Sequence, residues 1–333
     1  MGLFKLSAKT NINGVELNKL TYDDKDLFND IFFSKDHNSI MFYVNFPVLY
    51  CRSLSEKKEY YWKIIEGYLC IFVKLSSERV FLYTNPMSKN HDEKVFKGVI
   101  EECVRLIHRM NELSTSKNPN VYIDNCVYSL VEPLFDFSKK EKFDYGWDEF
   151  IFKTDDFIAM KGKQYKGRRN IINKFSKEYN HTIREYTMAD FDAIVRLRKL
   201  WIANKSIDEK KLWDKELFYE LFRQYDKLDT KAFVMEVNGN IEGVITLARL
   251  ASDCAVTINE TTNVEFQGMT EKLWHEGVKA TADFGEYTND GNGGKHTDGL
   301  YAYKSSFNPV QMNKVVGASF MGKNNELDFT VFK

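Results

Sequence analysis

A run of positive charge in the middle of the chain is the first feature whose residues could carry chemistry. Between Lys161 and Arg184 there are eight Lys or Arg side chains and a single acid, Glu178, so the segment has a net charge of +7. The complete chain has 47 basic and 48 acidic residues, a net charge of −1. A local field of one sign indicates a partner of the opposite sign, although the solvated surface of an ordinary helix gives the same pattern.

The start of this run contains side chains that suit phosphate binding. Arg168 and Arg169 adjoin a predicted helix start, where guanidinium groups and free backbone N–H groups can bind a phosphate together. Tyr165 and Phe175 offer rings that could stack on bases. The alternative is that the apolar residues of the segment simply form the core face of a helix. The predicted donor- or phosphate-binding residues are Lys163, Tyr165, Lys166, Arg168, Arg169 and Asn170.

A second group of candidates lies in the polar segment "EYTNDGNGGKHTDGLYAYKSSFNP", residues 286–309. Acyl transfer to an amine needs the amine uncharged and needs a donor for the oxyanion of the tetrahedral intermediate. We expect Asp290 to orient or deprotonate the amine and Lys304 to stabilise the oxyanion or bind phosphate. Tyr301 and Tyr303 offer further hydroxyl donors. The Gly, Asn and Asp residues predict loops and turns, where an Asp serves equally well as a helix cap.

The segment "TINETTN" adds a carboxylate, Glu260, on or beside a predicted central strand. It suits recognition of an amino group, and it suits an ordinary solvent-facing position equally well. The predicted catalytic residues are therefore Asp290, Lys304, Tyr301 and Glu260, and no metal site is predicted. The sequence has no His cluster at ligand spacing, no Ser-His-Asp signature, no P-loop and no GxGxxG motif.

Length and composition bound the class of protein. A chain of 333 residues suits two domains of about 150 residues each. With 43% hydrophobic and 15% aromatic residues, bulk disorder is excluded. The five cysteines are scattered without a CxxC pair, which argues against a zinc site or a disulfide framework. Because we find no long apolar run and no signal-peptide pattern, we expect a soluble cytoplasmic protein.

The elements that must position these residues follow a similar order in both halves. The first half predicts a helix over 22–37, strand-like runs over 60–75 and 79–87, an amphipathic helix over 92–113 and a strand over 120–128. A polar loop over 136–149 separates the halves. The second half predicts a strand and the basic helix, then helices over 188–206 and 214–228, a hairpin over 231–250 turning at Asn238-Gly239, a strand over 254–263 and a helix over 267–284.

This order predicts an α+β protein made of two tandem acetyltransferase (GNAT)-like domains. Each domain would contain a mixed, mostly antiparallel sheet flanked by helices. The predicted boundaries are residues 1–145 for the N-terminal domain and 146–333 for the C-terminal domain, which would carry the donor site. Fold analogy alone does not fix the chemistry.

Two motifs resemble the phosphatidylglycerol lysyltransferase C-terminal-domain family, also described as DUF2156-like. The first, "DEFIFKTDDFIAMKGKQYKGRRNIINKF", matches the family pattern at Gly162, Lys163, Tyr165, Arg169, Asn170, Ile172 and Phe175. The second, "GLYAYKSSFNP", matches it at Gly299, Leu300, Lys304, Phe307, Asn308 and Pro309. The resemblance extends over about residues 15–320, and the two motifs cover about a tenth of the chain.

The resemblance implies an aminoacyltransferase that moves an aminoacyl group from aminoacyl-tRNA to an acceptor amine or hydroxyl. It implies no cofactor beyond this donor substrate, and leaves open whether the acceptor is a small molecule, a peptide or a lipid headgroup. The chain departs from the family pattern at Tyr301, where the family has Arg. We also expect no counterpart of the membrane domain of the lipid-modifying members.

Two alternatives remain beside this interpretation. One is an acyl-CoA-dependent N-acyltransferase, because Gln164-x-x-Gly167-x-Arg169 partly matches the loop that binds the CoA pyrophosphate. Arg169, however, stands where that loop needs a small residue, and the segment precedes the wrong helix. The other alternative is a non-catalytic RNA- or phosphate-binding module, which the Tyr301 departure favours.

Overall fold

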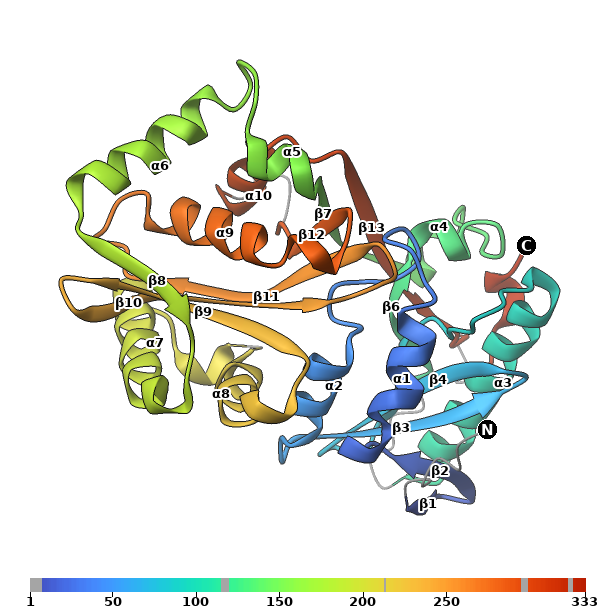
Figure 1. Cartoon of the computed structure of the whole chain (residues 1–333). Coiled ribbons are helices and arrows are strands. Elements are labelled where there is room, and N and C mark those ends of the chain that lie inside the picture. Colours follow the sequence, from blue (N-terminus) through green and yellow to red (C-terminus); the bar gives the residue numbers. More distant parts are fainter. Residues whose placement is uncertain (1–7, 115–119, 213, 295–298, 323–325) are drawn as a thin grey trace. The chain divides into compact units, whose positions relative to one another are not determined.

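The computed structural model describes residues 8–114, 120–212, 214–294, 299–322 and 326–333, and it is an α+β protein with mixed sheet structure flanked by helices (Figure 1). The chain divides into two compact units, Met1–Asp148 with Asn313–Lys333, and Glu149–Met312. We call them the first and the second unit. In the part of the chain that the structure describes, no helix is long and apolar enough to span a bilayer.

The sheet of the first unit has the strand order β1-β2-β3-β4-β5-β6-β13, with β5 and β6 parallel and the other assigned pairs antiparallel. Its strands are β1 (Lys9–Ile12), β2 (Val15–Lys19), β3 (Lys58–Ile65), β4 (Tyr68–Leu75), β5 (Val80–Thr84), β6 (Tyr122–Val127) and β13 (Gln311–Ser319). Its helices are α1 (Lys25–Phe32), α2 (Phe46–Ser53), α3 (Glu93–Glu112) and α4 (Tyr128–Val131).

Helix α3 forms because apolar residues recur along it at helical spacing and because Asp92 caps its start. The Asp92 carboxylate accepts hydrogen bonds from the backbone N–H groups of Lys94 and Val95. The apolar face of α3 packs into one cluster with the strands, and that cluster includes the buried thiols of Cys70, Cys103 and Cys126. All five cysteines of the chain are buried and reduced.

The second unit contains the sheet order β7-β12-β11-β10-β9-β8. The strands are β7 (Phe143–Lys153), β8 (His181–Glu185), β9 (Thr230–Val237), β10 (Asn240–Arg249), β11 (Cys254–Thr262) and β12 (Tyr287–Asn292). The helices are α5 (Thr154–Ala159), α6 (Lys166–Glu178), α7 (Phe191–Lys205), α8 (Lys215–Arg223), α9 (Met269–Ala280) and α10 (Gly299–Ser305).

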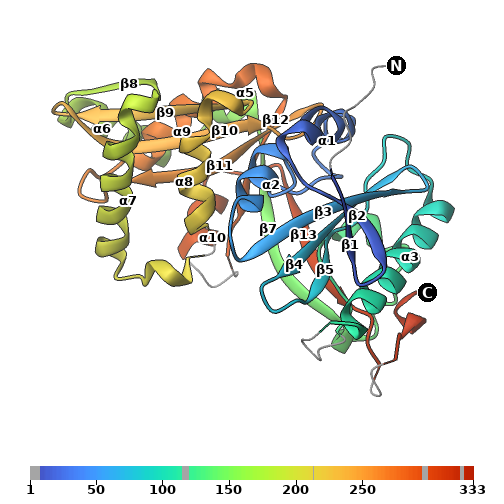
Figure 2. The same ribbon diagram turned by 90° about the horizontal axis from the view of Figure 1, so that it is seen from below.

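The two faces of the second unit's sheet are covered by different helices (Figures 1 and 2). On one face, α6 and α9 pack in a cluster with Ile245, Leu247 and Trp274. On the other face, α7 and α8 pack in a cluster with Val234 and Val244. Because neighbouring strand residues point to opposite faces, β9 and β10 each supply residues to both clusters.

The hairpin of β9 and β10 forms at the predicted turn. Asn238 has a φ of 52° and Gly239 a φ of 81°, which is the pair of positive φ values that a type I′ turn requires. Strand β11 then pairs with β10, and α9 carries the chain back so that β12 lies parallel to β11. The predicted helices over 92–113, 188–206, 214–228 and 267–284 are confirmed within a few residues at each end.

Four sequence-based expectations are wrong. The run over 60–75 is a hairpin, because Glu66 and Gly67 adopt positive φ and reverse the chain between β3 and β4. The expected loop over 136–149 contains the first residues of β7. The polar segment 286–309, expected to form loops and turns, contains α10, and its residues 295–298 lie outside the described part. The last residues, 313–333, belong to the first unit rather than to a domain over 146–333, because β13 pairs with β6.

Candidate functional site

Strands β11 and β12 of the second unit pair over a short stretch and then separate, and the candidate site lies where they separate. These strands pair from Cys254 opposite Tyr287 to Val256 opposite Asn289. Strand β12 continues beside β7, while β11 continues to Thr262 with no further β12 partner among the described residues. The pairing of β10 with β11 shifts register after Thr246, which marks a β-bulge at this point.

The residues just beyond this divergence are polar. Asn259 and Glu260 are the partly exposed residues in an otherwise buried β11. The Glu260 Oε1 atom is nevertheless out of solvent, and within the described residues it has no hydrogen-bond partner. Burial raises the pKa of Glu260 well above its ordinary value, and the nearby Asp290 and Glu271 carboxylates raise it further, against the opposing effect of Lys304. Burial and the neighbouring carboxylates therefore favour the protonated form of Glu260 more than they would for an exposed glutamate.

Lys304 reaches from α10 to the end of β12. Its ammonium group donates hydrogen bonds to the backbone carbonyl oxygens of Asp290 and Asn292, the latter at 3.0 Å, and lies 3.1 Å from Asp290 Oδ2. These contacts use the three N–H donors of the ammonium. The two candidates Lys304 and Asp290 are thus in contact, but Lys304 holds the end of β12 in place and has no spare donor for an oxyanion.

Asp290 is buried beside this ammonium group. Burial raises the pKa of Asp290, and the attraction of Lys304 offsets this only in part. Its neighbour in sequence, Asn289, donates a hydrogen bond of 2.8 Å to Glu149 on β7 and accepts one from the Gly291 backbone N–H at 2.7 Å. These bonds fix the bulged end of β12 and thereby the direction of the Asp290 side chain.

Arg168 connects α6 to the start of α9. Its guanidinium Nη1 donates to Glu271 Oε1 at 2.9 Å, a second nitrogen donates to the hydroxyl of Ser306, and its plane lies over the rings of Tyr303 and Phe307 at 4.9 and 4.5 Å. Glu271 lies in the first turn of α9, where a carboxylate is stabilised by the helix dipole. Arg168 is therefore part of the buried framework of the site, not a free phosphate ligand.

The two tyrosines of α10 have different surroundings. The Tyr303 hydroxyl is buried without a hydrogen-bond partner in the described residues, and burial followed by the charge of Glu260 raises its pKa. The Tyr301 hydroxyl instead contacts the Met312 sulfur at 3.3 Å, and its ring packs edge-on against Phe150. The structure thus brings Tyr303 to the polar cluster and directs the hydroxyl of the predicted Tyr301 to Met312.

The basic segment divides into exposed and internal charges. Arg169 donates hydrogen bonds to the backbone carbonyl oxygens of Met160 and Gly162, which close the turn after α5. Tyr165 and Phe175 are packed in the core, so the expectation that they present faces to bases is wrong. Asn170 and the lysines are exposed. The charge that solvent meets along α6 and the turn before it comes from Lys161, Lys163, Lys166, Lys174 and Lys177.

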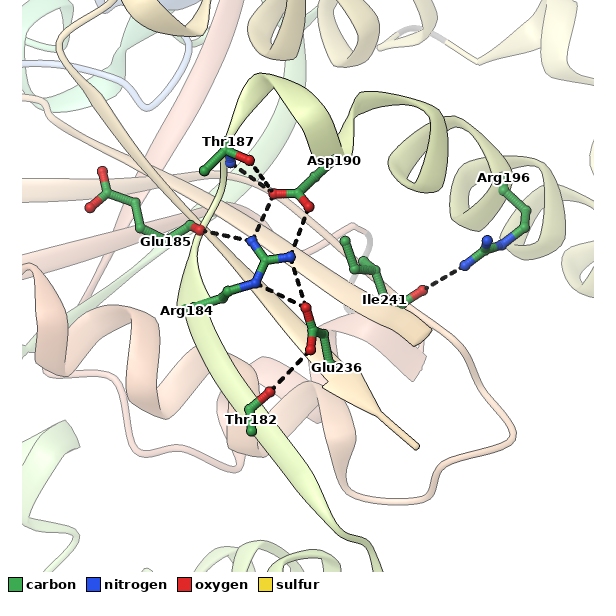
Figure 3. Close-up of polar contacts among 8 residues, drawn as sticks. All are labelled: Thr182, Arg184, Glu185, Thr187, Asp190, Arg196, Glu236 and Ile241. Atoms are coloured by element: carbon green, nitrogen blue, oxygen red, sulfur yellow. Dashed lines mark hydrogen bonds and ion pairs between the residues drawn. The ribbon is translucent and has the colours of Figure 1, made fainter. Parts of the chain in front are cut away.

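Arg184, at the end of the segment, is neutralised (Figure 3). Both of its terminal nitrogens donate to Asp190 at 2.8 Å, and its Nε donates to Glu236 at 2.9 Å. Hydrogen bonds from Arg184, above all, lower the pKa of Asp190 to about 2. Since Asp190 also accepts bonds from the backbone N–H and the hydroxyl of Thr187, this group anchors the start of α7 to β8.

Sequence reasoning missed three polar residues of the second unit. Glu271 has the pattern of an ordinary first-turn helix acid, and only the fold brings it to Arg168. Asn259 lies in a predicted strand and Arg198 in a predicted amphipathic helix. The periodicity of apolar residues predicts these elements but says nothing about their polar side chains. The segment "TINETTN", which contains two polar residues in succession in a buried strand, was the available signal. No group of described residues could hold a metal ion.

Solved structures show the same fold at low sequence identity. A conserved protein of unknown function from Bacteroides thetaiotaomicron matches with a TM-score of 0.73 and 17% identity, covering 91% of this chain and 98% of that one. The C-terminal DUF2156 domain of a candidate lysylphosphatidylglycerol synthetase from Agrobacterium fabrum matches at 0.62 and 12%, covering 91% and 93%. FemX matches at 0.60 and 10%, covering 91% and 97%. No curated protein matches.

The mixed sheet of the second unit, in which two parallel strands separate, belongs to an α+β protein. Residues 52–316 match the family "Phosphatidylglycerol lysyltransferase, C-terminal". The chain belongs to this family, as the two motifs in its sequence indicate.

Proposed function

We propose that the protein is an aminoacyltransferase that moves an aminoacyl group from aminoacyl-tRNA to an amine or hydroxyl acceptor, with the reaction in the second unit. The observation that carries this proposal is the buried Glu260 Oε1 atom, which has no hydrogen-bond partner among the described residues and interacts electrostatically with the Asp290–Lys304 pair. Membership of a lysyltransferase family supports aminoacyl transfer as the reaction class.

The chemistry needs no covalent enzyme intermediate, because the ester of aminoacyl-tRNA is already activated. The acceptor amine attacks the ester carbonyl carbon, a C–N bond forms, and the C–O bond to the tRNA ribose breaks. Glu260 takes the proton of the attacking nitrogen and returns it to the departing ribose oxygen. A carboxyl group whose pKa is raised by burial suits this exchange, which typically contributes 10²–10⁴-fold to a rate.

The remaining groups have supporting roles in this proposal. Tyr303 keeps its hydroxyl proton to high pH and can donate a hydrogen bond to the oxyanion. Lys304 fixes the end of β12 and the Asp290 carboxylate, so both act as positioning residues. Arg168 and Glu271 are also positioning residues, because the hydrogen bond between them holds α6 against α9. The proposal thus keeps Lys304 and Asp290 at the site and replaces Tyr301 with Tyr303.

The exposed lysines of α6 and the turn before it support a polyanionic donor such as tRNA. Lysines that neutralise phosphates contribute a large, salt-dependent share of nucleic-acid affinity. The site residues predicted from sequence that remain available for such contacts are Lys163, Lys166 and Asn170. Arg168 and Arg169 contribute indirectly, because they hold α6 and its preceding turn in position.

The start of α9 argues against CoA as the donor. In acetyltransferases the pyrophosphate binds at the corresponding helix N-terminus, where glycines allow close approach. Here Gly268 precedes α9, and a Cβ placed on it would lie 3.1 Å from the Ile171 carbonyl oxygen and 3.2 Å from Phe175 Cβ. Helix α6 therefore covers this N-terminus, which favours tRNA over CoA.

We also propose that each unit is a GNAT-like domain, because each contains a strand, a long helix and a parallel strand in succession. The tandem arrangement and the function are tested together by incubating the full chain with a mixture of charged tRNAs and candidate amines. Aminoacyl transfer above the rate of spontaneous hydrolysis supports the proposal. Salt-sensitive tRNA binding without any transfer would instead assign a binding module, and stabilisation by CoA alone would assign an acyl-CoA enzyme.

A further inference from the structure

An aromatic patch lies on the surface of the second unit, where α6 ends. It combines Tyr179, which follows α6 directly, with Phe266 from the connection between β11 and α9 (Figure 1). The two ring centres are 5.2 Å apart, and the ring planes are nearly perpendicular, at 87°. Both rings pack against the core but remain partly exposed, and the neighbouring Val264 side chain is 52% exposed. Because solvent already reaches these side chains, a ligand can contact them without opening the core.

Hydrogen bonds fix the backbone that carries both rings. The Tyr179 backbone N–H donates to the Phe175 carbonyl oxygen at 3.0 Å, and the Tyr179 carbonyl oxygen accepts from Nδ1 of His181 at 2.9 Å. The Phe266 backbone N–H donates to the Asn263 carbonyl oxygen at 3.3 Å. A ligand that stacks on these rings therefore requires little further ordering of the protein, which favours binding.

The aromatic patch adjoins the positive charge of α6. This helix exposes Lys166, Lys174 and Lys177, and its sequence contains a single acid, Glu178. Lys174 pairs with Glu178 at 3.7 Å, whereas Lys177 has no ion-pair partner within the part of the chain that the structure describes. The exposed Glu265 is the opposing charge beside the Phe266 ring. Exposed rings next to a predominance of lysines are the combination with which proteins bind single-stranded nucleic acids.

We propose that Tyr179 and Phe266 form a stacking platform for an unpaired base of an RNA strand. A nucleobase has an apolar face that stacks on an aromatic ring, and this contact tolerates any of the four bases. The phosphates on either side of the base are attracted by Lys177 and its neighbours on α6. That the strand is the acceptor end of aminoacyl-tRNA rests on the proposed function, whereas the stacking of a base rests on the rings and the lysines.

The platform and the candidate reaction centre lie on the same face of the sheet. Glu260 is paired with Ile245 across β11 and β10, and directly paired residues point to one face. Ile245 belongs to the cluster against which the rings of Tyr179 and Phe266 pack. The connection that carries Phe266 also continues directly from β11, the strand of Glu260. One RNA strand can therefore approach the platform and Glu260 from a single side, as the proposed reaction requires.

The test measures binding of a short RNA without charged tRNA, so its failure is distinct from failure of the transfer reaction. Fluorescence anisotropy with the full chain compares a labelled RNA of six cytidines with a strand of the same length and charge that lacks bases. The parent chain should bind the strand with bases about 5- to 100-fold more tightly, the effect of one stacked base. Tyr179→Leu and Phe266→Leu keep an apolar side chain but remove a ring, so each should abolish most of this preference and leave the salt dependence unchanged.

Matched variants separate stacking from a general effect of aromatic residues. Tyr179→Phe keeps the ring and should keep the preference for the strand with bases. Tyr145→Leu in the first unit should change nothing, although Tyr145 is 49% exposed and its ring centre lies 5.2 Å from the Lys314 ammonium group. Tyr145 is thus also an exposed ring beside a lysine, but it lies outside the second unit.

Three results would overturn the proposal. The first is that the parent chain binds neither strand or binds both equally, and the second is an unchanged preference in the Leu variants at an unchanged melting temperature. The third is an equal loss of preference in Tyr145→Leu. If aminoacyl transfer is nevertheless observed, the proposed function stands without the platform. Because Phe266 lies in a connection rather than in a helix, Phe266→Leu keeps the test decisive if Tyr179→Leu does not fold.

Discussion

Both units contain a strand, a long helix and a second strand parallel to the first, and they differ in whether the two parallel strands stay bridged along their length. In the first unit, α3 connects β5 to the parallel β6, and in the second, α9 connects β11 to the parallel β12. In the first unit, side-chain amides bridge the paired strands. Asn125 donates to the Tyr83 carbonyl oxygen at 3.2 Å, and Asn85 accepts from the Val127 backbone N–H at 3.1 Å.

The corresponding strands of the second unit separate instead. Beyond Val256, β11 carries the partly exposed Asn259 and Glu260, whereas every residue of β5 is buried. The unsatisfied buried atoms of the first unit are ring nitrogens and a phenol, while those of the second include a carboxyl and a carboxamide. The same strand–helix–strand arrangement is therefore closed by side-chain amides in the first unit. In the second unit it leaves polar side chains where the two strands separate.

The largest expected effect is a loss of transfer rate when one carboxyl group of the second unit is replaced, compared with replacement of one in the first unit. Glu260→Gln keeps the size of the side chain but removes its capacity to accept a proton, so transfer should fall by roughly 10²–10⁴-fold. Asp124→Asn is the matched control, because Asp124 in the first unit is a partly buried carboxyl group whose pKa is also raised by burial. Single-turnover rates with charged tRNA measure both, and equal losses in the two variants would remove the functional distinction between the units.

The next effect concerns the lysine that holds the end of β12. Lys304→Met leaves Asp290 and two backbone carbonyl oxygens without their buried cation, so the free energy of unfolding should fall by about 3–5 kcal/mol. Urea denaturation measures this loss. Asp290→Asn combined with Lys304→Met should recover part of the stability; if it recovers none, the pair is not the source of the loss.

A smaller effect concerns the anchor of α7 and its dependence on pH. The folded-state pKa of Asp190, about 2, is below its ordinary value of 3.8, so its contribution to stability is present above pH of about 4 and is lost as the pH falls toward 2. Because Arg184 is partly exposed, we expect Asp190→Asn to cost only about 1–2 kcal/mol at neutral pH. Thermal melts at pH 7 and pH 2.5 test this. The difference in melting temperature between the variant and the parent must be smaller at pH 2.5 than at pH 7.

The smallest effects are expected from single surface lysines. Lys166→Glu or Lys177→Glu on α6 should weaken tRNA binding and reduce the slope of log affinity against log salt by roughly 1 each, with stability nearly unchanged. Lys94→Glu, on an exposed position of α3 in the first unit, is the matched control. Equal losses from α3 and α6 would indicate a diffuse attraction rather than a defined tRNA contact.

The parts of the fold that follow from local pattern were predictable, and the parts that depend on distant partners were not. The helical period of α3 and the Asn238-Gly239 turn specify their structures within a few residues. The first residues of β7 escaped prediction because most of them are polar or exposed, so neither the alternation of apolar residues nor hydrophobicity indicates a strand there. The return of β13 to the first unit depends on pairing with β6, which no local signal specifies.

The same division applies to the site. Residue type suggested Glu260, Asp290 and Lys304, and the fold does bring them to one cluster. Residue type could not distinguish Arg168, which is bound to Glu271, from the exposed lysines of α6, because all of them are cations in one segment. Nor could it choose between Tyr301 and Tyr303, since two residues along a helix change the direction of a side chain by more than half a turn.

The burial of all five thiols gives the native chain a practical property. Maleimide reagents should leave the folded protein unlabelled, so a cysteine introduced at an exposed position, such as Lys177 on α6, would be the single reactive site without removal of any natural one. A dye or photo-crosslinker attached there would report directly on an approaching nucleic acid. Labelling of the parent chain would in turn serve as a sensitive signal that its core has opened.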